Sequence, residues 1–411
     1  MMVPSKISYR VLPVWKREAM FVLATVTLFA LMGCSTFQTA EQTSILVQQH
    51  AEKGYVVKKH YDTTSVHQTW QIGTDAMEIT LTLPTGSGLY PLVLYLPGLG
   101  ESSNAGAQWR RGWAEAGYAV LSAQPIAIGE KVWSSEAALA GEFREIAKGQ
   151  FSKHALADRL IVLRGVLDEL RRQQENKDTA LFNHVDLSRL AIAGYDLGAQ
   201  TAMSAAGEQS DGVELAPFPD AVKCVIAFSP YADLSGADLG SRFRSIRVPV
   251  LTVTSNNDTD AYGWVTSAAV RQTPYQYMPP NQKYLLLLSS ASHFLLAGKE
   301  VPAAGRQDDK AARTPRAPDA NEGDDNGGTG HRDGGSGRKG RKGREGGSRA
   351  ETGALMLQQE LSAFERLEIT DIQQVSTAFL DATAKNDPQA REWLSKDAQR
   401  WLADTATIST K

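Results

Sequence analysis

Three side chains able to carry out hydrolysis follow one another along the chain: a carboxylate, a second carboxylate and a histidine. Asp196 stands at the centre of the turn Gly194–Gly198, Asp258 lies in an Asn- and Asp-rich turn that also offers Asp260, and His293 comes last. A carboxylate can attack carbon or take a proton from water, and a histidine oriented by a second carboxylate can activate water. We therefore expect Asp196, His293 and Asp258 to form a catalytic triad, with Asp260 as the alternative acid.

Each of these residues follows an apolar run that predicts a buried strand. The runs are Arg189–Ala193, Val248–Thr254 and Tyr284–Leu288. Asp and Asn are common turn formers, and a lone loop histidine is often structural. In open α/β sheets, however, ligands bind beyond the carboxyl ends of the strands, so three such residues at three strand ends favour one site.

Glycines surround the first carboxylate and a second loop. Gly194 and Gly198 permit a crowded turn that lifts the central side chain above the sheet. The loop Pro97-Gly98-Leu99-Gly100 follows the apolar run that begins at Pro91. We expect the backbone amides of Leu99 and Leu197 to form an oxyanion hole.

The remaining pattern predicts an α/β fold. Strands that alternate with helical stretches indicate a mostly parallel sheet with helices on both faces. Further strands are expected at Met77–Pro84 (antiparallel, from its alternation), Pro91–Pro97, Tyr118–Ser122 and Val222–Phe228, and helices at Ala107–Ala116, Ala155–Gln174, Ala199–Ala206, Asp371–Ala384 and around Trp393 and Trp401.

Composition divides the chain into segments. Its 411 residues allow one large domain, and a formal net charge of −3 gives no reason to expect a nucleic-acid partner. Residues 301–353 are rich in Gly and charge without apolar periodicity, so we expect a disordered insert, and we interpret its basic run Arg338–Arg344 as solvated linker rather than a phosphate-binding patch. The folded core that carries the candidate triad is expected at 66–300, with C-terminal helices in 354–411 completing the domain.

The N-terminus has the features of a bacterial lipoprotein signal. A basic segment precedes the apolar run Ala19–Gly33, and Leu31-Met32-Gly33-Cys34 resembles a lipobox. We expect residues 1–33 to be removed, Cys34 to be acylated, and residues 34–65 to form a tether with a short helix. Ser35 then implies the outer membrane, facing the periplasm. An ordinary signal peptide or an uncleaved anchor is the alternative.

No other feature indicates a bound group. The only other cysteine, Cys224, lies in an apolar run, so no disulfide is expected. No Cys/His spacing indicates a metal site, and we expect no cofactor.

The segment Pro91–Pro125 carries the clearest likeness to a known family. With its Leu-Pro-Gly-Leu-Gly loop and the stretch Trp113–Leu121, it resembles the dienelactone hydrolase and platelet-activating-factor acetylhydrolase branch of the α/β-hydrolases. The resemblance covers roughly residues 70–300 and the C-terminal helices. It implies an α/β-hydrolase fold without a large cap domain, a small-molecule substrate, and the chain order nucleophile, acid, histidine.

Asp196 departs from that branch, which has serine or cysteine at this position. Haloalkane dehalogenases and epoxide hydrolases have an elbow aspartate that forms an alkyl-enzyme ester, which histidine-activated water then hydrolyses. Those enzymes follow the aspartate with Trp rather than Leu197, and the gap between Phe228 and Val248 is too short for their cap. Three interpretations remain: a covalent nucleophile acting on a small ester-, epoxide- or halide-like substrate, a base for direct attack by water, or a catalytically inactive binding or scaffold module. We prefer a hydrolase, with the substrate and the oligomeric state left open.

Overall fold

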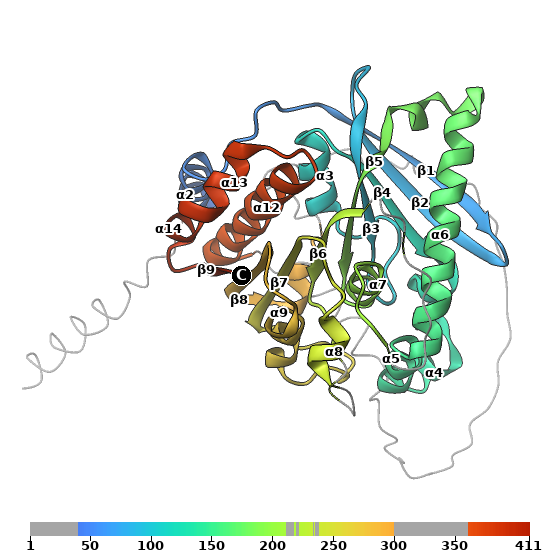
Figure 1. Ribbon diagram of the computed structural model, residues 1–411. Helices are drawn as coiled ribbons and strands as arrows, with labels where there is room; N and C mark the ends of the chain where they lie inside the picture. The colour runs from blue at the N-terminus through green and yellow to red at the C-terminus, as the bar shows by residue number, and fades with distance from the viewer. Residues whose placement is uncertain (1–39, 211–217, 219–221, 233, 235–237, 300–360) are drawn as a thin grey trace, which may run out of the picture. The chain divides into compact units, whose positions relative to one another are not determined.

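A nine-stranded sheet organises the chain (Figure 1). The computed structural model describes residues 40–210, 218, 222–232, 234, 238–299 and 361–411. The strand order is β1-β2-β4-β3-β5-β6-β7-β8-β9. The six strands from β4 to β8 in this order run parallel, whereas β1, β2 and β9 pair antiparallel with their neighbours. The predicted α/β class with a mostly parallel sheet is therefore confirmed. The strands are β1 (Thr63–Ile72), β2 (Asp75–Pro84), β3 (Tyr90–Leu96), β4 (Ala119–Pro125), β5 (Val185–Tyr195), β6 (Val222–Phe228), β7 (Val250–Asn257), β8 (Lys283–Ser292) and β9 (Ala406–Thr410).

Two of these strands, β1 and β9, have no counterpart among the predicted elements. Both are edge strands, and most of their side chains are exposed or only partly buried. Trp70 pairs with Met77 at one edge, and Ala406 pairs with Leu288 at the other. An edge strand is held mainly by backbone hydrogen bonds on one side, so it does not need the apolar pattern by which a buried strand is recognised.

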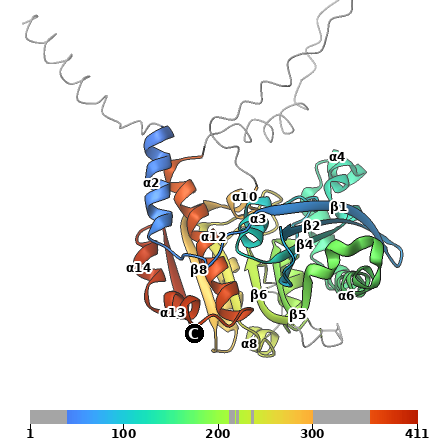
Figure 2. The ribbon, with the colours of Figure 1, turned by 90° about the horizontal axis from the view of Figure 1, so that it is seen from above.

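Helices cover both faces of the sheet (Figures 1 and 2). One face packs against α6 (Lys153–Glu175), α7 (Leu197–Ala205) and α8 (Leu239–Phe243). Helix α6 begins where the Ser152 hydroxyl accepts the Ala155 N–H at 3.3 Å. It then buries a stripe at helical spacing, as its sequence predicts: Leu156, Leu160, Leu163, Val166, Leu167 and Leu170.

The opposite face packs against α3 (Ala107–Glu115) and α12 (Ala363–Thr383). Trp109 and Trp113 of α3 are fully buried, and Trp113 donates its indole N–H to Ser376 of α12 at 2.9 Å. Helix α12 starts with a capping box between Ser362 and Glu365, eight residues before the predicted start at Asp371. A shared apolar cluster and a hydrogen bond therefore join two helices that lie far apart in sequence.

Apart from α2 (Ala40–Glu52), the remaining helical elements are short. They are α4 (Glu136–Leu139), α5 (Phe143–Gln150), α9 (Thr273–Tyr277), α10 (His293–Leu296), α13 (Pro388–Lys396), α14 (Ala398–Leu402) and the 3₁₀ turns η1 (Ile126–Ile128), η2 (Glu130–Ser134), η3 (Lys177–His184) and η4 (Ala268–Gln272).

The segment expected as a tether contributes to the folded unit. It contains helix α2 (Ala40–Glu52), and residues from Val47 onward belong to one compact unit with the sheet. His50 contacts the Asp371 carboxylate at 2.7 Å, and its ring stacks on Trp401 with centroids 4.4 Å apart. Tyr55 donates its hydroxyl to Asp381 at 2.7 Å. Contacts with α12 and α14 therefore hold the end of α2 and the residues that follow.

Three predicted features fall outside the described residues: the signal peptide 1–33, the lipidation site Cys34 and the insert 301–353. Among the helices that the structure does describe, none has both the length and the apolar composition needed to cross a membrane.

Candidate active site

Asp196 lies in a strained turn between β5 and α7. Its φ of 51° and ψ of −107° are unusual for a residue with a side chain, and its N–H donates to the Phe228 carbonyl at 3.0 Å. A Cβ on Gly194 would lie 2.3 Å from the Gly198 carbonyl oxygen, and a Cβ on Gly198 would lie 1.9 Å from the Leu96 carbonyl oxygen. The turn therefore has no space for a side chain at position 194 or position 198.

His293 lies between two carboxylates that come from different strands. Asp258 directly follows β7, and His293 begins α10 directly after β8. The His293 Nδ1 is 2.7 Å from Asp258 Oδ1, and its Nε2 is 3.9 Å from Asp196 Oδ1. The first distance is a hydrogen bond and the second is too long for one. The fold thus brings together the three residues that the sequence singled out.

The alternative acid, Asp260, has a different structural role. Its carboxylate accepts the backbone N–H groups of Tyr262 at 2.9 Å and Trp264 at 3.0 Å, and also that of Val265. Asp258 instead accepts the Thr254 hydroxyl at 2.6 Å with the oxygen that does not face the imidazole. Of the two carboxylates, Asp258 is the one that contacts His293.

Arg271, which sequence reasoning did not identify, joins all three aspartates. It lies in η4 and its side chain is fully buried. It donates to Asp196 Oδ1 at 3.3 Å and to the Ser229 carbonyl at 2.5 Å, and it lies 3.8 Å from both Asp258 and Asp260. Within the described part of the chain, its Nε and Nη2 have no hydrogen-bond partner. No local pattern around Arg271 marks it, because its partners lie elsewhere in the sequence.

The surroundings push the pKa values of the two carboxylates beside His293 in opposite directions. Burial raises the pKa of Asp196 above its ordinary value, and the charges of His293 and Arg271 only partly oppose that rise. Burial also acts to raise the pKa of Asp258, but the hydrogen bond from His293 and the charge of Arg271 outweigh it, so the pKa is lowered. Such a separation is typical of paired groups with different roles.

Within the described residues, the two backbone amides expected to form the oxyanion hole donate no hydrogen bond to another group. Leu99 and Leu197 are both 1% exposed and belong to one apolar cluster. In the described structure neither residue's N–H donates a hydrogen bond, whereas the neighbouring N–H of Gly100 donates to Ile128 at 2.9 Å. The Tyr262 hydroxyl donates to the Leu99 carbonyl at 3.1 Å and helps to hold this loop.

Glu101 is a second group that the sequence did not reveal. Its carboxylate accepts the Gly98 N–H at 2.9 Å, at the start of the expected oxyanion loop. Tyr195 packs between this loop and the histidine. A Cβ on Gly98 would lie 2.8 Å from the Tyr195 ring, and the Tyr195 hydroxyl donates to the His293 carbonyl at 2.9 Å. Burial raises the pKa of Glu101 to about 7, and the negative charge of Asp196 adds to the rise. The site therefore includes a carboxyl that titrates near neutral pH.

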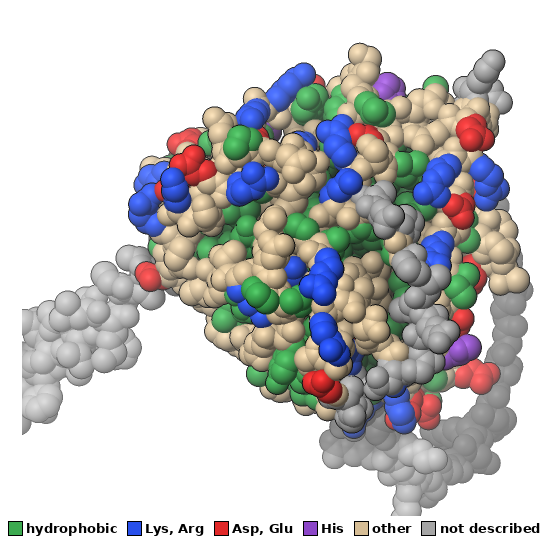
Figure 3. Space-filling view, viewed as in Figure 1, with side chains coloured by type: hydrophobic (Ala, Val, Ile, Leu, Met, Phe, Trp, Pro, Cys, Tyr) green, Lys and Arg blue, Asp and Glu red, His purple; other side chains and the backbone are tan. Residues whose placement is uncertain are grey.

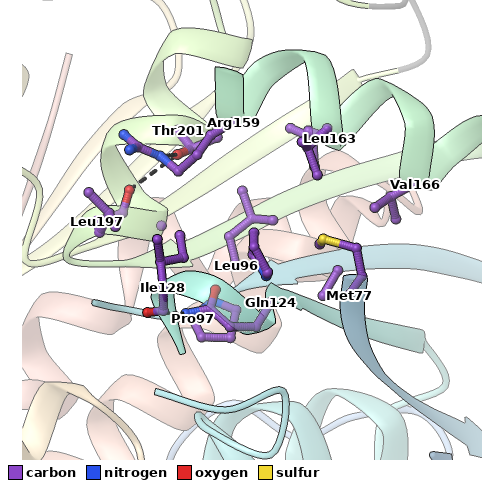
Figure 4. Close-up of a pocket in the computed structure, with 14 residues that line it drawn as sticks. Met77, Leu96, Pro97, Gln124, Ile128, Arg159, Leu163, Val166, Leu197 and Thr201 are labelled. Carbon is purple, nitrogen blue, oxygen red and sulfur yellow. Dashed lines mark hydrogen bonds between the residues drawn. The ribbon is translucent and has the colours of Figure 1, made fainter. Parts of the chain in front are cut away.

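A small cavity lies beside helix α7, which follows the Asp196 turn (Figure 4). Its volume of about 30 Å³ leaves space for water but not for a substrate. On its wall, Arg159 donates to the Thr201 hydroxyl at 2.9 Å, which in turn donates to the Leu197 carbonyl at 3.2 Å. Burial lowers the pKa of Arg159 to about 9. We infer that these contacts help to hold the turn at Asp196.

The described residues contain no group of three or more His, Cys, Asp or Glu side chains arranged to hold a metal ion. A scan against protein-family models finds none that matches this chain, and a search of curated proteins finds no match either.

Proposed function

We propose that this protein is an α/β-hydrolase-type enzyme that uses Asp196 as a covalent nucleophile on a small ester-, epoxide- or halide-like substrate. One observation carries the proposal: His293 lies 2.7 Å from Asp258 and 3.9 Å from Asp196, at the carboxyl ends of three parallel strands. The order nucleophile, acid, histidine along the chain is that of α/β-hydrolases.

The fold assignment belongs to the same proposal. The strand β5, the tight turn at Asp196 and the helix α7 form the strand–turn–helix context of a nucleophile elbow. Between β6 and β7 the structure describes only the short helix α8, which supports a hydrolase fold without a large cap domain.

In the first step, an Asp196 carboxylate oxygen attacks a saturated carbon of the substrate. The bond from that carbon to its leaving group breaks, the leaving group takes the electron pair, and an alkyl ester forms on Asp196. The contact with Arg271 at 3.3 Å favours the ionised carboxylate that this attack requires. Leu99 and Leu197 adjoin partly buried aromatic residues in the same apolar cluster, which suits an apolar substrate group: Trp133, Tyr231, Tyr262 and Trp264.

In the second step, His293 takes a proton from water and the resulting hydroxide attacks the carbonyl carbon of the ester. The N–H groups of Leu99 and Leu197 stabilise the negative charge that develops on the carbonyl oxygen. Asp258, whose lowered pKa keeps it anionic, stabilises the protonated imidazole. The intermediate then expels the alcohol, which takes the proton from His293. The carboxylic acid left at Asp196 releases its proton to water, and the carboxylate is restored.

One observation favours a second function, that of a non-catalytic binding or scaffold module. Asp196 is only 1% exposed, and one of its oxygens already accepts a hydrogen bond from Arg271. A carboxylate held in this way is a weaker nucleophile than a free one, because an attack must compete with the arginine for its electrons.

Intact-protein mass spectrometry distinguishes these functions. A His293→Gln variant is incubated with pooled ester, epoxide and haloalkane substrates, and the double variant with Asp196→Asn is the control. The covalent mechanism predicts a stable mass increase in the single variant that maps to Asp196 and is absent from the control. Turnover by the wild type without an adduct would indicate that Asp196 acts as a base, and neither turnover nor adduct would favour the binding module.

We also propose, from the sequence alone, that the mature chain begins at an acylated Cys34 and is anchored in the outer membrane, facing the periplasm.

A further inference from the structure

A second, larger pocket lies at the opposite end of the sheet from Asp196 and His293. Its volume is about 560 Å³. Its walls include the loop Gly86–Gly88 and Tyr90, which lead into β3, and Gly117, which precedes β4. These residues lie at the amino ends of the parallel strands, whereas the candidate active site lies at their carboxyl ends. A ligand in this pocket would therefore not touch the catalytic residues.

Four cationic side chains line the pocket: Lys58, Lys59, Arg189 and Lys385. Two carboxylates, Asp381 and Asp387, line it with them. Figure 3 shows several Lys and Arg side chains over the upper part of one face of the molecule. The lining of the pocket thus carries an excess of positive charge.

Neighbouring groups already engage the two carboxylates. Asp381 accepts the hydroxyls of Tyr55 and Tyr118, both at 2.7 Å, and the ammonium of Lys385 at 2.8 Å. Asp387 accepts the Gln389 N–H at the start of α13. These aspartates are therefore tied to the helices and can satisfy only part of the donor capacity of the lysines and the arginine.

The cations retain donors that an anion could use, although Arg189 pairs through Nε with Asp186 at 2.5 Å. An ammonium has three N–H groups and a guanidinium five. Lys58 contacts Asp387 at 2.6 Å, and Lys385 also donates to the Ala116 carbonyl at 2.8 Å. In the described structure Lys59 makes no ion pair and lies over the ring of Tyr61, 4.4 Å from its centroid.

Two further features of the pocket favour an anionic ligand: one cation acts on another, and backbone amides lie beside them. Burial lowers the pKa of Lys385, Asp381 opposes that change, and the charge of Arg189 lowers the pKa further. Gly86, Ser87 and Gly88 also line the pocket, and within the described residues none of their N–H groups donates a hydrogen bond. Adjacent cations beside free backbone amides are a common setting for oxyanion binding.

We propose that this pocket binds a phosphate group, carried either by a small solute or by a phospholipid headgroup. Donors reach the pocket from four separate segments of the chain, which suits a tetrahedral oxyanion better than a planar carboxylate. The pocket is larger than a phosphate ion, so it also has space for the group that bears the phosphate, against the apolar side chains of Val57 and Leu89.

The test uses the full chain carrying Cys34→Ser, so that no lipid anchor contributes to binding. Equilibrium dialysis with radioactive inorganic phosphate measures the free ion, and cosedimentation with phosphatidylglycerol vesicles, against phosphatidylcholine vesicles, measures the headgroup. We expect saturable binding in at least one arm. Each of Lys59→Gln and Lys385→Gln should weaken it about tenfold, because each removes a charge-assisted hydrogen bond.

Lys153→Gln, an exposed lysine of α6 away from the pocket, is the matched control and should bind as the wild type does. If Lys385→Gln fails to fold, Lys59→Gln alone decides, because that side chain has no ion pair to lose. Saturable binding of free phosphate that these variants weaken supports a solute, and binding confined to phosphatidylglycerol supports a headgroup. No saturable binding in either arm, or equal binding by the Lys59→Gln and Lys153→Gln variants, would overturn the proposal.

Discussion

Replacing Arg271 by methionine tests whether its guanidinium holds the site in its charged state. The side chain is fully buried and lies within 3.8 Å of Asp196, Asp258 and Asp260. Methionine fills similar volume but leaves the carboxylates without their shared cation. Removing one partner of a buried ion pair typically costs about 3–5 kcal/mol in the free energy of unfolding, and we expect the upper half of that range because three acids share this cation.

The same change should weaken the nucleophile. The charge of Arg271 lowers the pKa of both Asp196 and Asp258, so its removal will raise both pKa values. Asp196, whose pKa burial already raises, will then be protonated in a larger fraction of molecules at pH 7. When Arg271→Met is added to His293→Gln, the rate of adduct formation should fall because a smaller fraction of Asp196 is ionised. Raising the pH should restore part of that rate.

Urea unfolding of four proteins measures the coupling: the wild type, Arg271→Met, Asp196→Asn and the double variant. The double variant should regain part of the lost stability, with a coupling free energy of about 1–3 kcal/mol, because one of the uncompensated charges is gone. Arg242→Met is the matched control. Arg242 makes a buried ion pair with Glu208, with an N–O distance of 2.6 Å, and this pair lies outside the candidate active site. This variant should lose comparable stability without coupling to Asp196. A cost below about 1 kcal/mol for Arg271→Met, or coupling no larger than in the control, would refute the reasoning.

The remaining predictions address single features. Because folding raises the pKa of Glu101 from 4.5 to about 7, the folded protein binds this proton more tightly, so stability should fall as pH rises from about 5 to 7, by at most about 3 kcal/mol. Glu101→Gln should flatten urea-unfolding stability over that range, and an unchanged slope would count against the raised pKa. Asp196→Ser should create activity on short p-nitrophenyl esters that Asp196→Ala lacks; equal activities would mean that the oxyanion loop is not aligned with the elbow. Gly198→Ala places a Cβ 1.9 Å from a backbone oxygen of β3 and should cost about 3 kcal/mol or more, whereas Gly149→Ala, which meets nothing within 4 Å, should be neutral or stabilising in thermal unfolding. Labelling with a palmitate analogue should mark the wild type and not Cys34→Ser, and label on that variant would exclude acylation of this thiol.

Local sequence pattern was sufficient to predict the buried elements and the strand ends that carry the site. The leucine spacing of α6 and the apolar runs of β3, β5, β6, β7 and β8 reflect burial of a face, which is a property of neighbouring residues. The glycines around Asp196 were recognisable for the same reason, since crowding in a tight turn is local. The edge strands β1 and β9 escaped prediction because they bury little and so leave no such pattern.

Only the tertiary structure decided which polar groups meet. The sequence favoured Asp258 but left Asp260 open as the acid, and the direction of their side chains assigns Asp258 to His293 and Asp260 to backbone amides. Arg271 reaches Asp196 across 75 residues of sequence because the strand order places η4 beside the elbow. The rise in the pKa of Glu101 is likewise due to the side chains packed around it. Apolar periodicity in a sequence indicates which residues of a helix or strand are buried. Charge pairing depends on distances between side chains that are set only when the chain folds.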